Sequence, residues 1–142
     1  MKLPDKIVSD APTMGQLLRS VGILPTTQRL RVADLVLSRH QHLSATGVYK
    51  RVNAAGTPVS RATIYNTLGL FVARGLVREI ITGNNRIFYD SNISHHHHFF
   101  DTEAGELKDI EVAELKIIGV PKPPAGKVIS EVDLVIRLKS QK

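Results

Sequence analysis

Four short helical patterns followed by a β-rich hairpin pattern occupy residues 14–90, and their order limits the folds open to the chain. The clearest helix begins after Ser60, a good N-cap, and carries apolar residues at Ile64, Leu68 and Phe71 before Gly75 ends it. Three shorter helices are predicted before it, over residues 14–21, 27–37 and 45–55. Residues 76–81 and 86–89 are β-rich and flank a turn at 82–85. Together these elements predict a winged helix-turn-helix.

In a winged helix the last helix enters the major groove of DNA, so polar residues near its N-terminus are candidate base readers. Arginine suits guanine or phosphate, asparagine suits adenine, and a tyrosine ring can pack on a thymine methyl group. An amphipathic helix also has a polar face without touching DNA, and Tyr65 could instead cover the edge of the core. The predicted DNA-binding residues are Arg61, Thr63, Tyr65 and Asn66 in the last helix, Arg29 in the second helix and Arg86 at the wing.

Charge is divided unevenly along the chain. Residues 1–90 hold 12 of the 19 Lys and Arg residues but 5 of the 13 Asp and Glu residues. This positive excess favours a polyanionic partner, and an ordinary basic surface is the alternative. Residues 91–142 have a small negative excess, which indicates a different role. We therefore predict a DNA-binding domain over 1–90, a hinge at about 90–94 and a second domain over 95–142.

The second part begins with four histidines, His95 to His98, which lie inside the chain and not at a terminus, where an expression tag would stand. Side chains alternate along a strand, so His96 and His98 share one face and His95 and His97 share the other. The chain has no cysteine, so disulfides and thiolate sites are excluded and any metal needs nitrogen and oxygen ligands. Such ligands suit ferrous, manganous or zinc ions.

Two further strands are predicted beyond the histidines, at residues 107–110 and at 128–138, the second of which contains the alternating run 132–138, with a loop at 121–126 between them. A sheet this small cannot bury its own face, which favours pairing with a second copy of the chain. The predicted fold class is α+β, with an N-terminal winged helix-turn-helix domain followed by a small α/β dimerisation domain.

Several classes of protein are disfavoured. No stretch approaches the roughly 20 apolar residues of a membrane helix, and the N-terminus lacks the hydrophobic run of a signal peptide, so we expect a cytoplasmic protein without a membrane partner. A catalytic metal among the histidines would need an open coordination position and a pocket, and the chain has no histidine-glutamate helix motif. We therefore expect neither an enzyme nor a small-molecule substrate.

Four motifs, in this order, resemble the ferric-uptake-regulator family of bacterial metal-sensing repressors over residues 14–140. The motifs are Gln28-Arg29-Leu30, His42-Leu43-Ser44-Ala45, Ser60-Arg61-Ala62-Thr63-Ile64-Tyr65, and the histidine run followed by Gly105. Within that family the four histidines, the absence of cysteine and the ending at 130–138 most resemble the iron response regulator subgroup, which senses haem.

The resemblance implies a homodimer that binds AT-rich inverted repeats of double-stranded DNA near iron-related genes, with metal occupancy setting the angle between its arms. The family's sensory metal site, carried over by position, comprises His42, Asp90, His96, His98 and Asp109. His95 and His97 match a second family site, or a haem site in the haem-sensing subgroup, and the alternative is solvated or hydrogen-bonded histidines. Glu111 and Glu114 are candidate further ligands only by their proximity.

The chain departs from the family pattern at two places. Asp101 and Ala104 stand where typical members carry a Cys-x-x-Cys pair, so no structural four-cysteine zinc is expected and packing alone would hold the sheet. Asn66 follows Tyr65 where arginine is usual, which alters the expected operator preference. The predicted function is a metal- or haem-responsive, sequence-specific repressor of iron homeostasis genes. A metal-independent basic winged-helix DNA-binding module is the alternative, and its affinity would fall steeply with salt at every sequence.

Overall fold

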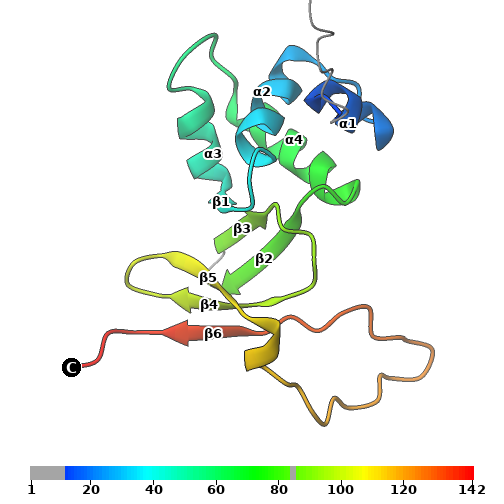
Figure 1. Cartoon of the computed structure of the whole chain (residues 1–142), viewed down its shortest axis with the longest axis vertical. Coiled ribbons are helices and arrows are strands. Elements are labelled where there is room, and N and C mark those ends of the chain that lie inside the picture. The colour runs from blue at the N-terminus through cyan, green and yellow to red at the C-terminus, as the bar shows by residue number, and fades with distance from the viewer. Residues whose placement is uncertain (1–11, 84–85) are drawn as a thin grey trace, which may run out of the picture.

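Two three-stranded sheets lie side by side, and four helices gather on the far side of the first sheet (Figure 1). The computed structural model describes residues 12–83 and 86–142. The helices are α1 (Met14–Ser20), α2 (Thr27–Val36), α3 (Ala45–Val52) and α4 (Arg61–Ala73). The first sheet contains β1 (His42–Ser44), β2 (Arg78–Gly83) and β3 (Arg86–Asp90). The second contains β4 (His97–Asp101), β5 (Glu106–Ile110) and β6 (Val135–Leu138), with a short 3₁₀ turn η1 (Val112–Glu114) after β5. This mixture confirms the predicted α+β class.

Each helix starts at a hydroxyl residue that accepts a hydrogen bond from a backbone N–H of the first turn. These N-caps are Thr13, Thr26, Ser44 and Ser60. A cap of this kind stabilises a helix by about 1 kcal/mol. The prediction for Ser60 is confirmed, and Ser44 caps the helix that was predicted to start at residue 45. Among the described residues the longest helix, α4, has 13 residues, fewer than the roughly 20 that a membrane crossing requires.

The third helix ends at Val52, earlier than the predicted end near residue 55. The Asn53 amide donates to the carbonyls of Tyr49 and Val59 and accepts the N–H of Val59, so its side chain replaces the next helical turn. Arg31 of α2 then donates to the carbonyls of Val52 and of two loop residues, Ala55 and Thr57. These bonds fix the loop that delivers α4.

The hydrophobic core lies between the helices and the adjoining face of the first sheet. Its most buried members are Leu18, Val32, Val36, Val48, Ile64, Leu68 and Phe71. Burial of each large apolar side chain contributes roughly 1.5–3 kcal/mol. The second sheet adds Phe100 and Ile110, and the Phe100 ring lies 5.9 Å from that of Phe88, so an aromatic pair joins the two sheets.

The first sheet has the order β1-β3-β2, and every pairing in it is antiparallel. No strand is predicted before the third helix, whereas residues 42–44 form β1 and pair with β3. Three residues are too few for a periodic pattern, and their partner lies far along the chain, so local reasoning missed this strand. The predicted hairpin turn at 82–85 includes residues 84 and 85, which lie outside the described part of the chain.

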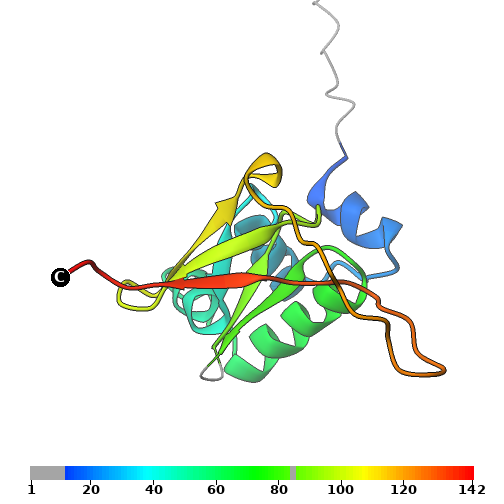
Figure 2. The same cartoon turned by 90° about the horizontal axis from the view of Figure 1, so that it is seen from below.

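The second sheet has the order β5-β4-β6, with β5 antiparallel and β6 parallel to β4. The strand predicted over 128–138 is correct only for Val135–Leu138. A strand needs a neighbour, and β4, which supplies it, begins only at His97, opposite this short segment. The residues between η1 and β6 instead form a long excursion that extends to one side of the molecule (Figure 2).

Candidate metal centre

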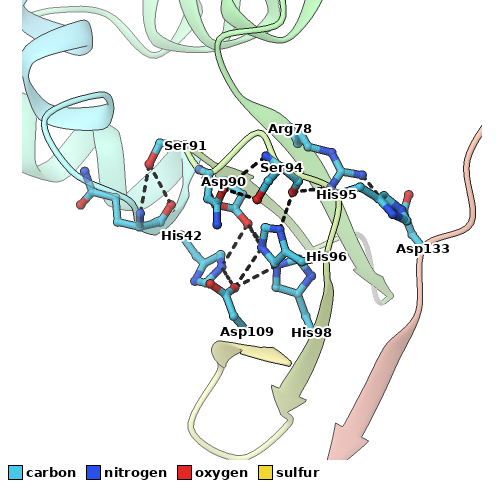
Figure 3. Close-up of polar contacts among 12 residues, drawn as sticks. His42, Arg78, Asp90, Ser91, Ser94, His95, His96, His98, Asp109 and Asp133 are labelled. Carbon is cyan, nitrogen blue, oxygen red and sulfur yellow. Dashed lines mark hydrogen bonds and ion pairs between the residues drawn. The ribbon is translucent and has the colours of Figure 1, made fainter. Parts of the chain in front are cut away.

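Five ligand-type side chains converge where the two sheets meet (Figure 3). They are His42, Asp90, His96, His98 and Asp109, and one ligand atom of each lies within 4.8 Å of all the others. The set implied by the resemblance is therefore brought together by the fold, from segments that span 67 residues of sequence between His42 and Asp109.

Backbone pairing explains why these side chains meet. His42 and Asp90 are directly opposite each other in the antiparallel β1–β3 ladder, and His98 and Asp109 are opposite in the β4–β5 ladder. Opposite residues of an antiparallel pair project to the same face. His96 precedes His98 by two residues and shares its face, as the alternation predicts. Each sheet thus presents its own preformed group of ligands.

Two carboxylate oxygens contact all three imidazoles. Asp90 Oδ2 lies 3.2, 2.9 and 3.0 Å from the Nε2 atoms of His42, His96 and His98. Asp109 Oδ1 lies 2.8, 3.1 and 3.3 Å from the same three nitrogens. The Asp90 side chain is 1% exposed and that of Asp109 is 43% exposed, so the cluster has a closed side and an open side. An ion could enter past Asp109.

The cluster shifts the pKa values of two of its members. Burial acts to raise the pKa of Asp90, but hydrogen bonds from His42, His98 and the backbone N–H of Asn92 outweigh it and hold that pKa well below its usual range. Burial acts to lower the pKa of His42, but hydrogen bonds and charge from Asp90 and Asp109 outweigh it, so that pKa is raised. Both shifts reflect a site that favours positive charge beside Asp90.

His96 provides a test of whether the site fits a metal. Its Nδ1–H donates to the carbonyl of Ser94 at 2.5 Å, so in the neutral ring Nε2 carries a lone pair. That Nε2 is buried and has no hydrogen-bond partner among the described residues, although carboxylate oxygens lie 2.9 and 3.1 Å away. A lone pair facing anionic oxygens is repulsive, and a cation placed among them would satisfy all of these groups. The imidazole and carboxylate donors fit manganous, ferrous or zinc ions.

His95 and His97, the other two histidines of the run, do not share a ligand cluster among the described residues. His95 lies near Glu131 and Asp133, all three exposed, and its Nε2–H donates to the carbonyl of Val132 at 2.9 Å. His97 instead accepts the N–H of Leu134 at Nδ1, at 3.0 Å. Glu131 and Asp133 lie within ligand distance of His95, and Glu111, one of the two candidates by proximity in sequence, lines a hollow with His95 and His97. The path of the chain after η1 brings Glu131 and Asp133 to this side of His95.

The predicted DNA-binding residues fall into three groups on α2, α4 and the first sheet. Arg29, Thr63 and Asn66 line one hollow between the start of α2 and α4. Tyr65 is 53% exposed and lines a second hollow beside the first sheet, which Arg86 also borders. The guanidinium of Arg61 stacks on the Tyr49 ring, 4.3 Å from its centre.

Arg86 is the first residue of β3, next to the predicted wing turn, and its side chain is exposed. The guanidinium of Arg86 reaches Gly105 in the β4–β5 turn of the second sheet. It lies so near that a Cβ added at Gly105 would be 3.0 Å from one of its Nη atoms. The side chain therefore spans both sheets, a placement that depends on how they pack against each other.

The β4–β5 turn corrects the expectation that packing alone holds the second sheet. Asp101 Oδ1 accepts the backbone N–H groups of Glu103 and Ala104, each at 2.9 Å. The Glu103 carboxylate in turn accepts the N–H and the hydroxyl of Ser140, while Thr102 donates to the carbonyl of Leu138. A carboxylate turn and a side-chain clamp thus organise the region where typical family members carry their first cysteine pair.

Comparison with known proteins gives consistent matches. Residues 20–124 match the profile of the family described as "Ferric uptake regulator family". The peroxide-responsive repressor PerR of Staphylococcus aureus (strain Mu50) is 32% identical over 101 residues, 71% of this chain and 68% of that protein. The structure of the ferric uptake regulator from Pseudomonas aeruginosa with manganese is 27% identical, has a TM-score of 0.70, and is matched over 92% of this chain and 100% of that one. The Vibrio cholerae ferric uptake regulator, at 23% identity and a TM-score of 0.68 over 90% of this chain and 100% of that one, is similar in fold.

Proposed function

The chain belongs to the ferric uptake regulator family of metal-responsive transcriptional regulators, and from this premise we propose that it is a DNA-binding repressor controlled by an ion held between its two sheets. Like other members of the family it is a regulator and not an enzyme. The observation that carries the proposal is the buried Nε2 of His96, which faces two carboxylates without a hydrogen-bond partner among the described residues.

The proposed metal ligands are His42, Asp90, His96, His98 and Asp109. A divalent ion would neutralise the two carboxylates and accept the imidazole lone pairs. His42 and Asp90 fix the position of the first sheet, on which the helices rest, relative to the second sheet. The ion can shift this arrangement by no more than its differential affinity for it, about 1.4 kcal/mol for each tenfold preference.

We propose that α2 to α4 and the β2–β3 hairpin act as a winged helix on double-stranded DNA, within a domain that spans 1–90. Support comes from the basic front half of the chain and from the shared hollow of Arg29, Thr63 and Asn66. Tyr65 is exposed on the same helix and is free to reach a base. The proposed operator is an AT-rich inverted repeat, because a dimer with two such arms matches a two-fold symmetric site.

A homodimer formed through residues 95–142, beyond a hinge at about 90–94, is the proposed assembly. Val112, Ile118 and Val128, all in the part of the chain after β5, are 78, 79 and 89% exposed, and burial of such apolar side chains against a second copy would be favourable. Within the family, the four-histidine run and the absence of cysteine support an iron response regulator that acts in the cytoplasm on iron homeostasis genes. Haem would then need histidine ligands, for which His95 and His97 are the proposed candidates.

The test is fluorescence anisotropy of a labelled AT-rich inverted-repeat duplex at one fixed salt concentration. Chelator-stripped protein is titrated alone, then with manganous or ferrous ion, then with haem. We expect metal to tighten binding at least about tenfold, equivalent to about 1.4 kcal/mol, and the double variant His96→Ala, His98→Ala to lose this response. Equal affinity with and without metal or haem would instead favour the metal-independent winged-helix module.

A further inference from the structure

Arg78 of β2 joins three parts of the molecule at the edge of the metal centre (Figure 3). Its Nη2 lies 3.1 Å from a Glu131 carboxylate oxygen and 3.0 Å from an Asp133 carboxylate oxygen, both in the segment that leads into β6. Its Nη1 donates to the carbonyl of Ser94 at 3.4 Å. The Arg78 side chain is 15% exposed, so these bonds are partly shielded from solvent.

The acidic pair beside Arg78 is not itself a good metal site. Although His95, Glu131 and Asp133 lie close enough to hold an ion, the guanidinium already occupies the position of the cation between both carboxylates. The Nε2 of His95 is also committed as a donor to the Val132 carbonyl. This cluster is therefore an ion-paired junction, in which one guanidinium nitrogen, Nη2, donates charge-assisted hydrogen bonds to two carboxylates.

The Ser94 carbonyl connects that junction to the metal centre. The same oxygen accepts the Nδ1–H of His96, the bond that turns the His96 lone pair toward the carboxylates. Among the residues that the structure describes, the other hydrogen bonds of Ser94 go to Asn92, whose side-chain oxygen accepts the Ser94 N–H and hydroxyl. The guanidinium therefore anchors the one carbonyl that selects the tautomer of a ligand imidazole.

We propose that Arg78 is a positioning residue of the metal centre, which makes metal affinity depend on docking of the 131–133 segment through the Ser94 carbonyl and His96. This rests on the proposed function of the centre. Groups that orient a ligand histidine commonly change metal affinity by 10–100-fold when they are removed. A loss toward the lower end is expected here, because Arg78 acts through a carbonyl and does not touch the ring itself.

The sign of the effect separates positioning from simple charge. Removing a cation near a metal site reduces repulsion and would tighten metal binding, whereas loss of positioning weakens it. Arg78→Lys keeps the charge, but one ammonium group cannot reproduce the fork that bonds two carboxylates and a carbonyl together. In Arg78→Ala, loss of positioning weakens metal binding and loss of the positive charge tightens it, so the two effects partly cancel. Arg78→Lys keeps the charge, so weaker metal binding in this variant reports loss of positioning.

The experiment is a calorimetric titration of chelator-stripped full-length protein with Mn²⁺. We expect Arg78→Ala to weaken Mn²⁺ binding about tenfold and Arg78→Lys at least about threefold. Arg74→Ala, which removes an exposed arginine at the end of α4, should bind as the wild type does. If Arg78→Ala misfolds, the double variant Glu131→Gln, Asp133→Asn releases Arg78 from two half-exposed carboxylates and should weaken binding about threefold.

A second measurement reads the imidazole directly. In long-range ¹H–¹⁵N spectra of the metal-free protein, we expect a single Nδ1–H form of His96 in the wild type and a mixture of tautomers in Arg78→Ala. Unchanged affinity and unchanged tautomer in the Arg78 variants would overturn the positioning role, and so would tighter binding in both of them. Failure of the wild type to bind Mn²⁺ would overturn the proposed function instead, so the two failures are distinct.

Discussion

Replacement of His96 by alanine is expected to abolish most of the stabilisation that a divalent ion gives this protein. The His96 ring is buried beside Asp90 and Asp109, and its Nε2 lacks a hydrogen-bond partner among the described residues. In the metal-free protein, alanine loses packing contacts but also removes this unsatisfied nitrogen, a gain of roughly 1–3 kcal/mol. The two effects oppose each other, so the melting temperature without metal should change little.

The magnitude with metal follows from mass action and chain length. An ion at a hundred times its dissociation constant stabilises the folded state by about 2.7 kcal/mol. For 142 residues, an unfolding entropy of about 2.1 cal/mol/K per residue amounts to about 0.3 kcal/mol/K. The wild type should therefore melt about 9 °C higher with metal. A hundredfold weaker site at the same ion concentration keeps only about 0.4 kcal/mol, or about 1 °C.

The assay is differential scanning calorimetry of stripped protein with and without Mn²⁺, repeated for His96→Ala and for a control, His40→Ala. His40 is exposed and lies outside the ligand cluster, so its variant should keep the whole shift. A shift of about 9 °C that persists in His96→Ala would refute the role of this imidazole as a ligand. A shift lost equally in both variants would show that the response does not arise at this centre.

Three further outcomes are expected. Because the pKa of His42 is raised, its contribution to the stability of the metal-free protein is present below about pH 6.5 and is lost as pH rises through the raised value. The metal-induced rise in melting temperature should instead grow with pH, because protons then compete less for the imidazoles. Melting curves from about pH 6 to 8 that show the same trend with and without metal would contradict this. Asp101→Ala should lower the free energy of unfolding, measured in urea, by about 1–2 kcal/mol, because two backbone N–H groups lose their acceptor. A chelator should leave the free energy of unfolding of the metal-free wild type unchanged. Arg31→Ala should lower the free energy of unfolding by about 1–3 kcal/mol, because the carbonyls of Val52 and Ala55 lose their donor. An unchanged urea midpoint would show that Arg31 does not stabilise the loop after α3.

The helices could be predicted well because their signals are local. Ser60 caps α4, and Ile64, Leu68 and Phe71 repeat at helical spacing, so the pattern and the structure agree. Strands depend on partners that a linear pattern does not reveal. The predicted strand 128–138 contains the alternating run 132–138, but only Val135–Leu138 lies beside β4.

The alternation of side chains predicted that His96 and His98 share a face, and both belong to the ligand cluster, although β4 begins only at His97. His42, Asp90 and Asp109 could be added only through the family resemblance, because two separate ladders bring them there. Arg78, which contacts the Ser94 carbonyl, carries no sequence signal that separates it from other basic residues. Its environment depends on the return of the chain after a long excursion, and that path follows from packing.

The division of the ligands between two sheets affects how this regulator would measure metal in a cell. On the proposed function, His96, His98 and Asp109 form one part of the ion site, and His42 and Asp90 would complete it only when the first sheet is in place. The apparent dissociation constant then equals the intrinsic constant divided by the fraction of molecules with the sheets together. DNA that selects this arrangement must raise metal affinity by the same factor by which metal raises DNA affinity. The set point of the sensor would therefore vary with the number of vacant operators, and protein bound to DNA would respond to scarcer metal than free protein.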